Sequence, residues 1–547
     1  MDRNPLELLL IILATVALAA CAGAERADDD DDDSGGDADA DTDGDADTDA
    51  DADTDTGQPA CVEGQTICVG EEVWECDANG DPGELVETCE DPLICLEGMC
   101  VEDSPCGYAM AYRSNVGCEY WAVDMDNTTP EQPYAVVVSN LEAGEDVHVV
   151  VEQRTDSGYT VLDEADVPDK STHVFMLGNN TVSGSYHLPR QAYRVTSDLP
   201  VVAYQFNPYA GLQPDNSDIC TNDGTLLIPS SGMDRYYYAL GYPSNAGTSS
   251  MNIVATEDDT TVNVTPSSAI MAGNGVPALA AGVPHTFFMQ AADVVQLNTS
   301  ADISGTYVEA DKYVGVFAGS TCAFVPSDVS YCDHVEHQMF PVTTWGTQFV
   351  AARSPIRSIN QQPENDYWRI MASEDGTTIA TNPTVPGIPG TMNAGQVVEV
   401  GVNYDFHITA SAPILVGQFL TGHEGTDVPF ESAGGDPAFA LTAPTAQFMT
   451  SYVFLAPEKY LSDWLVITHP NGLDVLLDTI LTSENPDCIT WPFDAEWEIT
   501  RCLIEDFTHT VDAAEPVGIT VWGYGGRVSY GYTGGLDLEV INPVAPE

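Results

Sequence analysis

From about residue 106 to the C-terminus, short runs of β-branched and aromatic residues alternate with Gly, Pro, Asn and Asp. The runs include AVVVS (135–139), VHVVVE (147–152), MNIVAT (251–256) and WLVIT (464–468). Runs of this kind, bounded by turn-forming residues, are typical of β-strands. No long segment has the 3.6-residue period of an amphipathic helix. The pattern therefore predicts an all-β region.

This strand pattern repeats along the chain. The segment YRVTSDLPVVAYQF (193–206) returns in related form at 308–319, 406–419 and 511–522. With Pro200, Tyr313, Pro413 and Pro516 taken as equivalent, the steps are 113, 100 and 103 residues. A second motif, LIPSSGMDRYY (227–237), recurs in the same order at 339–349 and 441–452. Motifs that recur in order at a near-constant spacing indicate tandem structural repeats.

A repeat of about 100 residues has room for about seven short strands, which is the size of an Ig-like β-sandwich. We therefore expect tandem β-sandwich-like repeats over residues 106–213, 214–324, 325–424 and 425–547. A single β-propeller, to which each repeat supplies one or two blades, is the alternative. The proline found at three of the four equivalent positions fits the first position of a strand, where a missing N–H group does little harm.

The N-terminal residues predict export from the cytoplasm. Residues 6–20 form an apolar run that is shorter than the roughly 20 residues of a spanning helix and has the length of a signal-peptide core. The ending Leu18-Ala19-Ala20-Cys21 resembles the lipobox of bacterial lipoproteins. The resemblance implies that residues 1–20 are a signal peptide and that Cys21 carries a lipid. An ordinary secretory signal peptide is the alternative.

Residues 21–60 predict a disordered acidic tether. Sixteen aspartates lie between residues 28 and 57, and six of them are consecutive. Like charges at this density repel one another, and the segment has no apolar side chains to bury. We therefore expect an extended, solvated linker.

Residues 61–105 predict a small disulfide-stapled module, because about 40 residues cannot bury a sufficient core unaided. Its cysteines are Cys61, Cys68, Cys76, Cys89, Cys95 and Cys100. Their spacing lacks the close pairs of a zinc site. Six cysteines allow 15 pairings, among which the sequence does not choose.

The β region contains further cysteines that lie close together in the sequence. We expect local disulfides between Cys106 and Cys118, Cys322 and Cys332, and Cys488 and Cys502. These assignments leave Cys220 either free or in a pairing that displaces one of them.

The formal net charge of −71, from 86 acidic and 15 basic residues, limits the classes of ligand that the protein can bind. It excludes binding of nucleic acid or of an anionic membrane through a basic face. The sequence also lacks a G-x-S-x-G elbow, an S-x-x-K motif, a P-loop and a G-x-G-x-x-G dinucleotide motif. We therefore expect no enzymatic activity and no cofactor.

The most polar stretch of the β region is Cys-Asp-His-Val-Glu-His (332–337). Its H-x-E start resembles that of zinc deaminases, but their P-C-x-x-C motif does not follow. A disulfide between Cys322 and Cys332 closes a small loop in this interpretation. We then expect exposed polar side chains at this loop to form a contact surface, namely those of Asp333, His334, Glu336 and Gln338.

Several stretches resemble the IgGFc-binding protein N-terminal domain family, which is frequent in bacterial surface proteins. They are GCEYWAVDMDN (117–127), AYRVTSDLPVVAYQFNP (192–208), CTNDGTLLIPSS (220–231) and CAFVPSDVSYCDHVEHQMFPVTTWGTQFVA (322–351). The resemblance covers roughly residues 106–535 and implies a non-catalytic surface region. The cysteine-rich module is similar to modules of myxobacterial-type surface lipoproteins.

Together these features predict a bacterial lipoprotein that is held in the outer membrane and exposed on the cell surface. Its expected partners are the membrane, through the lipid on Cys21, and an extracellular protein or glycan bound by the β repeats. A structural envelope spacer without a specific ligand is the alternative.

Overall fold

The computed structural model of the chain describes residues 64–542, except 129–132, 142–143, 179, 210–220, 245, 430–431 and 433. All described residues belong to the unit Ala60–Glu547. The predicted signal peptide, lipid-attachment residue Cys21, acidic tether, Cys61 and Cys220 lie outside the described residues. Within the described part, no helix has the length and apolar character needed to cross a bilayer.

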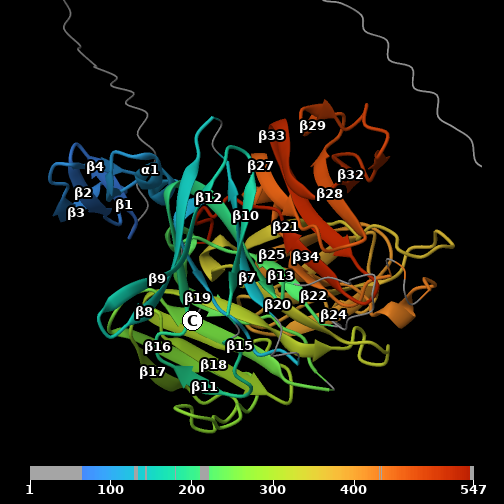
Figure 1. Ribbon diagram of the computed structural model, residues 1–547, viewed down its shortest axis with the longest axis horizontal. Coiled ribbons are helices and arrows are strands. Elements are labelled where there is room, and N and C mark those ends of the chain that lie inside the picture. The colour runs from blue at the N-terminus through green and yellow to red at the C-terminus, as the bar shows by residue number, and fades with distance from the viewer. Residues whose placement is uncertain are drawn as a thin grey trace, which may run out of the picture. The chain divides into compact units, whose positions relative to one another are not determined.

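The cysteine-rich module consists of two small sheets (Figure 1). They contain β1 (Thr66–Val69), β2 (Glu72–Cys76) and β3 (Pro82–Thr88), and the hairpin of β4 (Leu93–Leu96) and β5 (Met99–Glu102). Disulfides join Cys68 to Cys95 and Cys89 to Cys100, and Cys76 is also disulfide-bonded. Few large apolar side chains are buried here, so the disulfides provide the constraint that a core provides in larger domains.

The short helix α1 (Pro105–Ala111) connects the module to the β region. Ser104 caps it, because its hydroxyl accepts a hydrogen bond from the Gly107 N–H at 3.1 Å, and Pro105 occupies the first helical turn. The disulfide Cys106–Cys118 fastens α1 to β6 (Gly117–Ala122). This link fixes the helix against the edge of the first large sheet.

Each of the four large sheets is built on one long strand (Figure 1). These strands are β12 (Tyr193–Asn207), β19 (Tyr307–Ala323), β25 (Phe406–Phe419) and β33 (Phe507–Tyr524). They contain the four copies of the first sequence motif, which accounts for its period. The predicted all-β class with tandem sheets after a disulfide-rich module is therefore confirmed.

The long strands change partners part-way along, and the sheets bend there into half-barrels. In β12 the residues Tyr193–Ser197 pair with β8, whereas the residues from Val201 onward pair with β7. The register with a neighbouring strand shifts across each of the four equivalent positions, Pro200, Tyr313, Pro413 and Pro516. The prolines thus lie inside continuous strands, not at their first positions as expected, and the register break removes the need for their N–H groups.

The first two sheets contain six and seven strands besides their long strand. The first has β6, β7 (Tyr134–Asn140), β8 (Val147–Thr155), β9 (Gly158–Val167), β10 (Thr172–Leu177) and β13 (Asp223–Leu226). The second has β11 (Tyr186–Leu188), β14 (Asp234–Tyr238), β15 (Ser249–Ala255), β16 (Thr260–Thr265), β17 (His285–Met289), β18 (Val294–Thr299) and β20 (Asp333–Gln338). Because β11 precedes β12 in the chain, the two sheets are interlocked.

The remaining two sheets follow the same plan. The third has β21 (Gly346–Ala351), β22 (Asp366–Ala372), β23 (Ile379–Asn382), β24 (Val397–Val402) and β26 (Phe439–Leu441). The fourth has β27 (Met449–Ala456), β28 (Ser462–Pro470), β29 (Val475–Leu477), β30 (Ile480–Leu481), β31 (Cys488–Pro492), β32 (Trp497–Ile504) and β34 (Ser529–Thr533). The described strands after the module form four open sheets and no closed propeller.

The second sequence motif forms a 3₁₀ turn ahead of a strand in each sheet after the first. The turns are η1 (Ser230–Gly232), η2 (Val342–Thr344) and η4 (Thr445–Gln447), each preceded by a proline at the N-cap. A further turn, η3 (His423–Gly425), lies between β25 and β26. The largest apolar cluster runs from Tyr120 to Leu538 and contains side chains of all four sheets. Two smaller clusters lie within the third sheet and between the third and fourth sheets. The four sheets therefore pack against one another through a shared apolar cluster and are not independent domains.

The close approach of β19 and β20 makes Gly319 indispensable to the second sheet. A Cβ atom at this position would lie 1.9 Å from the carbonyl oxygen of Val335. We expect Gly319→Ala to lower the free energy of unfolding by about 2–3 kcal/mol, because the paired backbones must separate. Urea unfolding measures this, with Gly178→Ala as the control, since nothing lies within 4 Å of a Cβ built there. Equal stabilities of the two variants would contradict the packing argument.

Candidate functional site

The last strand of each large sheet returns to the centre of the molecule. These return strands are β13, β20, β26 and β34, and each pairs with the end of its own long strand. They also contact one another, β13 with β20 and β34, and β26 with β20 and β34. Figure 1 shows β13, β20 and β34 close together in the middle of the ribbon.

One carboxyl group connects all four return strands. Asp223 Oδ1 accepts from the N–H groups of Gly224 in β13, at 2.9 Å, and Gly531 in β34, at 3.4 Å. Asp223 Oδ2 accepts from Glu336 in β20, at 3.2 Å, and Phe439 in β26, at 3.1 Å. Asp223 is completely buried. We call this carboxyl with its four donors the central junction.

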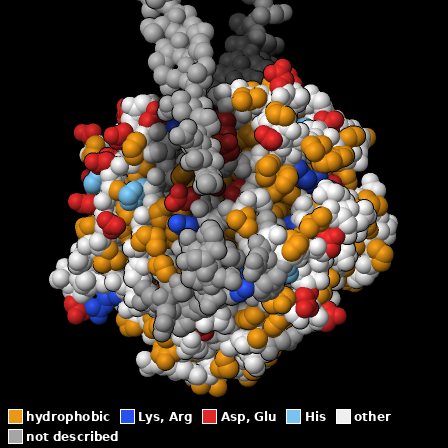
Figure 2. Space-filling model, turned by 45° about the vertical axis from the view of Figure 1, so that its right-hand side comes forward, with side chains coloured by type: hydrophobic (Ala, Val, Ile, Leu, Met, Phe, Trp, Pro, Cys, Tyr) orange, Lys and Arg blue, Asp and Glu red, His pale blue; other side chains and the backbone are white. Residues whose placement is uncertain are grey.

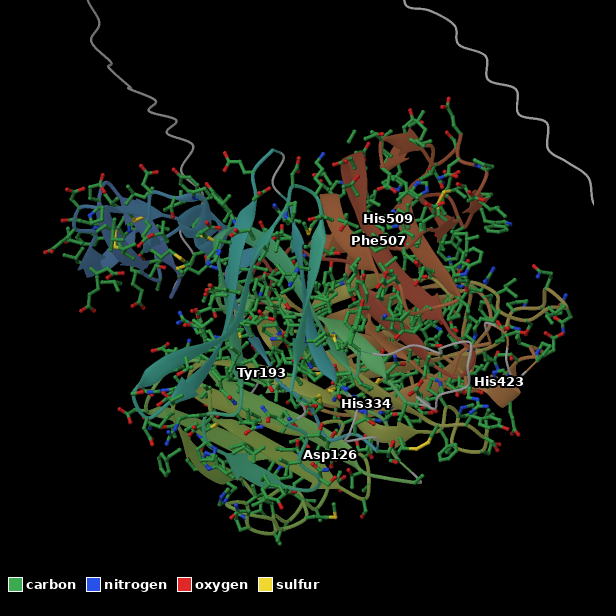
Figure 3. The ribbon with its side chains drawn as sticks, viewed as in Figure 1. Asp126, Tyr193, His334, His423, Phe507 and His509 are labelled. Carbon is green, nitrogen blue, oxygen red and sulfur yellow. A yellow bond between two sulfur atoms is a disulfide. The ribbon has the colours of Figure 1, made fainter. Side chains whose placement is uncertain are left out.

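The residues predicted to form a contact surface lie in this interior, so that prediction is wrong. Asp333, His334 and Glu336 are 0% exposed and Gln338 is 1% exposed. Figure 3 shows His334 inside the molecule, between the strands. The physical reason is that these residues form β20, which is covered by β19 and the other return strands. The loop that the Cys322–Cys332 disulfide closes precedes them.

Hydrogen bonds within β20 and from other elements compensate part of this polar burial, whereas Asp333 Oδ2 and His334 Nδ1 have no hydrogen-bond partner among the described residues. His334 Nε2 lies 3.2 Å from Glu336 Oε2, and Gln205 Nε2 donates to Glu336 Oε1 at 3.0 Å. Asp333 Oδ1 accepts from the His334 N–H at 2.8 Å. Gln338 Oε1 accepts from the Ile228 N–H at 2.8 Å. Each predicted site residue therefore has a structural role between strands.

Burial also sets the charge state of the interior. It raises the pKa of Asp223, of Asp333 and of Asp436 well above the usual range of a carboxyl group. It lowers the pKa of His337 to about 4. Burial thus favours the neutral form of both residue types. No group of three His, Cys, Asp or Glu side chains in the described part of the chain is arranged to hold a metal ion.

A cavity of about 430 Å³ opens between the module and the first large sheet, a volume typical of ligand sites. We call it the module groove. Leu93, Val101 and Glu102 of the module and Met110 of α1 line one side. The opposite side consists of Glu119 in β6, Arg194, Thr196 and Ser197 in β12, and Pro229, Ser230 and Ser231 around η1. The groove therefore combines apolar walls with hydroxyl and charged groups.

The charged side chains on the sheet side of the groove form ion pairs and hydrogen bonds with one another. Arg194 donates to Glu119 Oε2 through Nε, at 2.8 Å, and through Nη2. Arg194 Nη1 also lies 3.6 Å from Glu152 Oε2, and its guanidinium lies 5.0 Å from the centre of the Tyr159 ring. The Ser230 hydroxyl donates to Glu119 Oε1 at 2.8 Å. Because Arg194 is engaged by two carboxylates, it is not available as an anion site.

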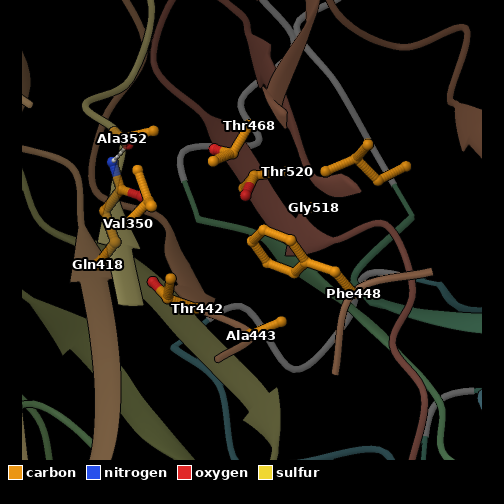
Figure 4. Close-up of a pocket in the computed structure, with 10 residues that line it drawn as sticks. Val350, Ala352, Gln418, Thr442, Ala443, Phe448, Thr468, Gly518 and Thr520 are labelled. Atoms are coloured by element: carbon orange, nitrogen blue, oxygen red, sulfur yellow. Dashed lines mark hydrogen bonds between the residues drawn. The ribbon is translucent and has the colours of Figure 1, made fainter. Parts of the chain in front are cut away.

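A second cavity, between the third and fourth sheets, is much smaller (Figure 4). Val350, Gln418, Phe448 and Thr520 are among its lining residues, and its volume is about 20 Å³. Gln418 Nε2 donates to the Ala352 carbonyl oxygen at 3.2 Å on its wall. This space admits about one water molecule. It is not a ligand site.

Sequence reasoning did not identify Asp223 or the groove. A signal for Asp223 existed, since aspartate precedes or begins three return strands, at Asp223, Asp333 and Asp436. The groove had a weaker signal in the alternation of GCEYWA (117–122) and YRVTSD (193–198), which puts Glu119, Arg194 and Thr196 on one sheet face.

Comparison with known proteins identifies a family for the β region. The sequence profile of the family described as IgGFc binding protein matches residues 223–523, a range that begins at Asp223. The human IgGFc-binding protein (Homo sapiens) is 27% identical over 346 residues, 61% of this chain. That match spans 6% of the human protein's length. No solved structure matches. Because the profile covers more than half of the sequence, this chain belongs to the IgGFc binding protein family.

Proposed function

We propose that this chain is a bacterial cell-surface lipoprotein whose β region binds an extracellular protein or glycan without catalysing a reaction. The observation that carries the proposal is the family match over residues 223–523, together with a human relative whose name describes binding. Lipid attachment at Cys21 in the outer membrane, the acidic tether of residues 21–60 and the division of the β region into four repeats are parts of the same proposal.

The shared core supports a role in presentation. An apolar cluster that contains side chains of all four sheets holds the surface loops in fixed relative positions, which favours recognition of a large partner. Its acidic surface, visible as scattered red side chains with few blue ones in Figure 2, favours partners without strong negative charge. The proposal assigns no cofactor and no nucleic-acid partner.

An array of purified ligands tests this function. The lipid-free chain from residue 22 is incubated with glycans, mucin and IgG Fc at low and high ionic strength. We expect saturable binding to a protein or neutral glycan ligand, with a dissociation constant that is micromolar or lower. Silence across the array, from protein shown to be folded and disulfide-bonded, would contradict the proposal and favour an envelope spacer.

A further inference from the structure

The module side of the groove is acidic without any compensation. Residues 64–105 contain twelve aspartates and glutamates and no lysine, arginine or histidine. Glu102, which lines the groove, is exposed, and its carboxylate makes no ion pair with any described residue. Across the groove, Arg194 is matched by Glu119 and Glu152. The groove therefore has an excess of negative charge and an unused carboxylate at its rim.

The apolar part of the groove suits an aliphatic chain. Met110 is 52% exposed, although it lies beside Leu93 and Val101 in the groove wall. Lysine and arginine carry long aliphatic stems that pack on such surfaces while their charged ends reach polar groups. A cationic side chain would therefore match both the apolar wall and the Glu102 carboxylate, which is unpaired within the described part of the chain.

We propose that the module groove binds a lysine- or arginine-bearing segment of a polypeptide partner, an inference that rests on the proposed binding function and names its site. The aliphatic stem packs against Met110 and Leu93, and the charged end pairs with the Glu102 carboxylate. The surrounding carboxylates of the module attract the basic segment at long range. Most of the groove lies outside the residues that the family profile matches, so the family match does not itself imply this ligand preference.

Fluorescence anisotropy with the lipid-free chain from residue 22 tests the proposal. The probe is a dye-labelled peptide of alternating lysine and valine, and its glutamate–valine counterpart is the charge control. We expect saturable binding of the lysine peptide that weakens as salt is added. Thr196→Trp, which fills the groove, should raise the dissociation constant at least tenfold, with thermal melting confirming its fold. Glu102→Gln should raise the dissociation constant about threefold, which corresponds to about 0.7 kcal/mol.

Glu84→Gln, an exposed carboxylate on β3 that does not line the groove, is the matched control and should change the affinity little. Equal losses from Glu84→Gln and Glu102→Gln, or unchanged binding by Thr196→Trp, would overturn the site in favour of diffuse attraction. Spermine binding as tightly as the peptide would overturn the assignment to a polypeptide. An array ligand whose binding survives Thr196→Trp would remove the groove from the proposed function and leave that function standing. Peptide binding that is lost in Thr196→Trp, together with no binding on the ligand array, would leave the groove site standing and contradict the proposed function.

Discussion

Replacing Asp223 with alanine is expected to lower the free energy of unfolding by about 4 kcal/mol or more, the largest effect of any single polar substitution in the β region. The carboxyl group accepts four backbone hydrogen bonds, one from each return strand. Alanine leaves these four N–H groups without their acceptor in a site that excludes water. Each buried, unsatisfied donor costs about 1–3 kcal/mol, and partial relaxation of the strands recovers some of that.

Thr225→Val is the matched control for this experiment. Thr225 lies two residues along the same strand, is also fully buried, and accepts one bond between strands, from the Gln338 N–H at 3.1 Å. We expect it to cost about 1–2 kcal/mol. Urea unfolding followed by tryptophan fluorescence measures both variants. A loss for Asp223→Ala no greater than that for Thr225→Val would show that the four strands are held together by the apolar core alone.

The second large effect is a pH dependence that resides in Asp463 of β28. Asp463 is 2% exposed, its Oδ1 accepts from the Tyr530 hydroxyl at 2.7 Å, and burial raises its pKa to about 7. The negative charge of Asp506 raises this pKa further, whereas the Tyr530 hydrogen bond opposes the rise. Between the unfolded pKa of 3.8 and the folded pKa of about 7, the folded state binds more protons than the unfolded state. The stability that this proton provides is complete below the unfolded pKa and is lost as the pH rises through the folded pKa.

Comparing the wild type with Asp463→Asn isolates this contribution. Asparagine keeps an acceptor for Tyr530 but does not ionise. Relative to the wild type, the free energy of unfolding of the variant should therefore rise by up to about 4 kcal/mol between about pH 4 and pH 8. The opposite contribution of His337, whose pKa is lowered to about 4, is present in both proteins and cancels in the difference. Urea unfolding across this pH range measures the difference curve, with the exposed Asp163→Asn as control. A constant difference would contradict the burial argument for Asp463.

The sequence predicts the periodic features of this fold because local chemistry determines them. The recurrence of YRVTSDLPVVAYQF is a strand-length pattern, and its four copies are the four long strands. The interior of the sheets is different, because several side-chain partners of β20 come from far away in the chain. Gln205, which donates to Glu336, lies 131 residues before it. A run such as Asp-His-Val-Glu-His has the polarity of a surface loop until those distant donors are known.

The candidate groove was beyond sequence reasoning for a related reason. Its walls come from the module, α1, β6, β12 and η1, and although the first three follow one another in the chain, β12 and η1 lie far from them in sequence. Arg194 reads as an ordinary exposed residue of an alternating strand until Glu119 and Glu152 are placed beside it. Cavities formed between distant elements leave no periodic trace in either wall.

The shared acceptor at Asp223 fixes how many repeats this architecture can contain. In a solenoid each unit contacts only its neighbours, so units can be gained or lost at the ends while the rest stays intact. Here the two oxygen atoms of one side chain serve one strand from each of four units. A fifth unit would find no acceptor, and a missing unit would leave a lone pair facing an empty position in the core. A single added repeat would therefore lack the hydrogen bond by which each of the four existing repeats is joined to the others.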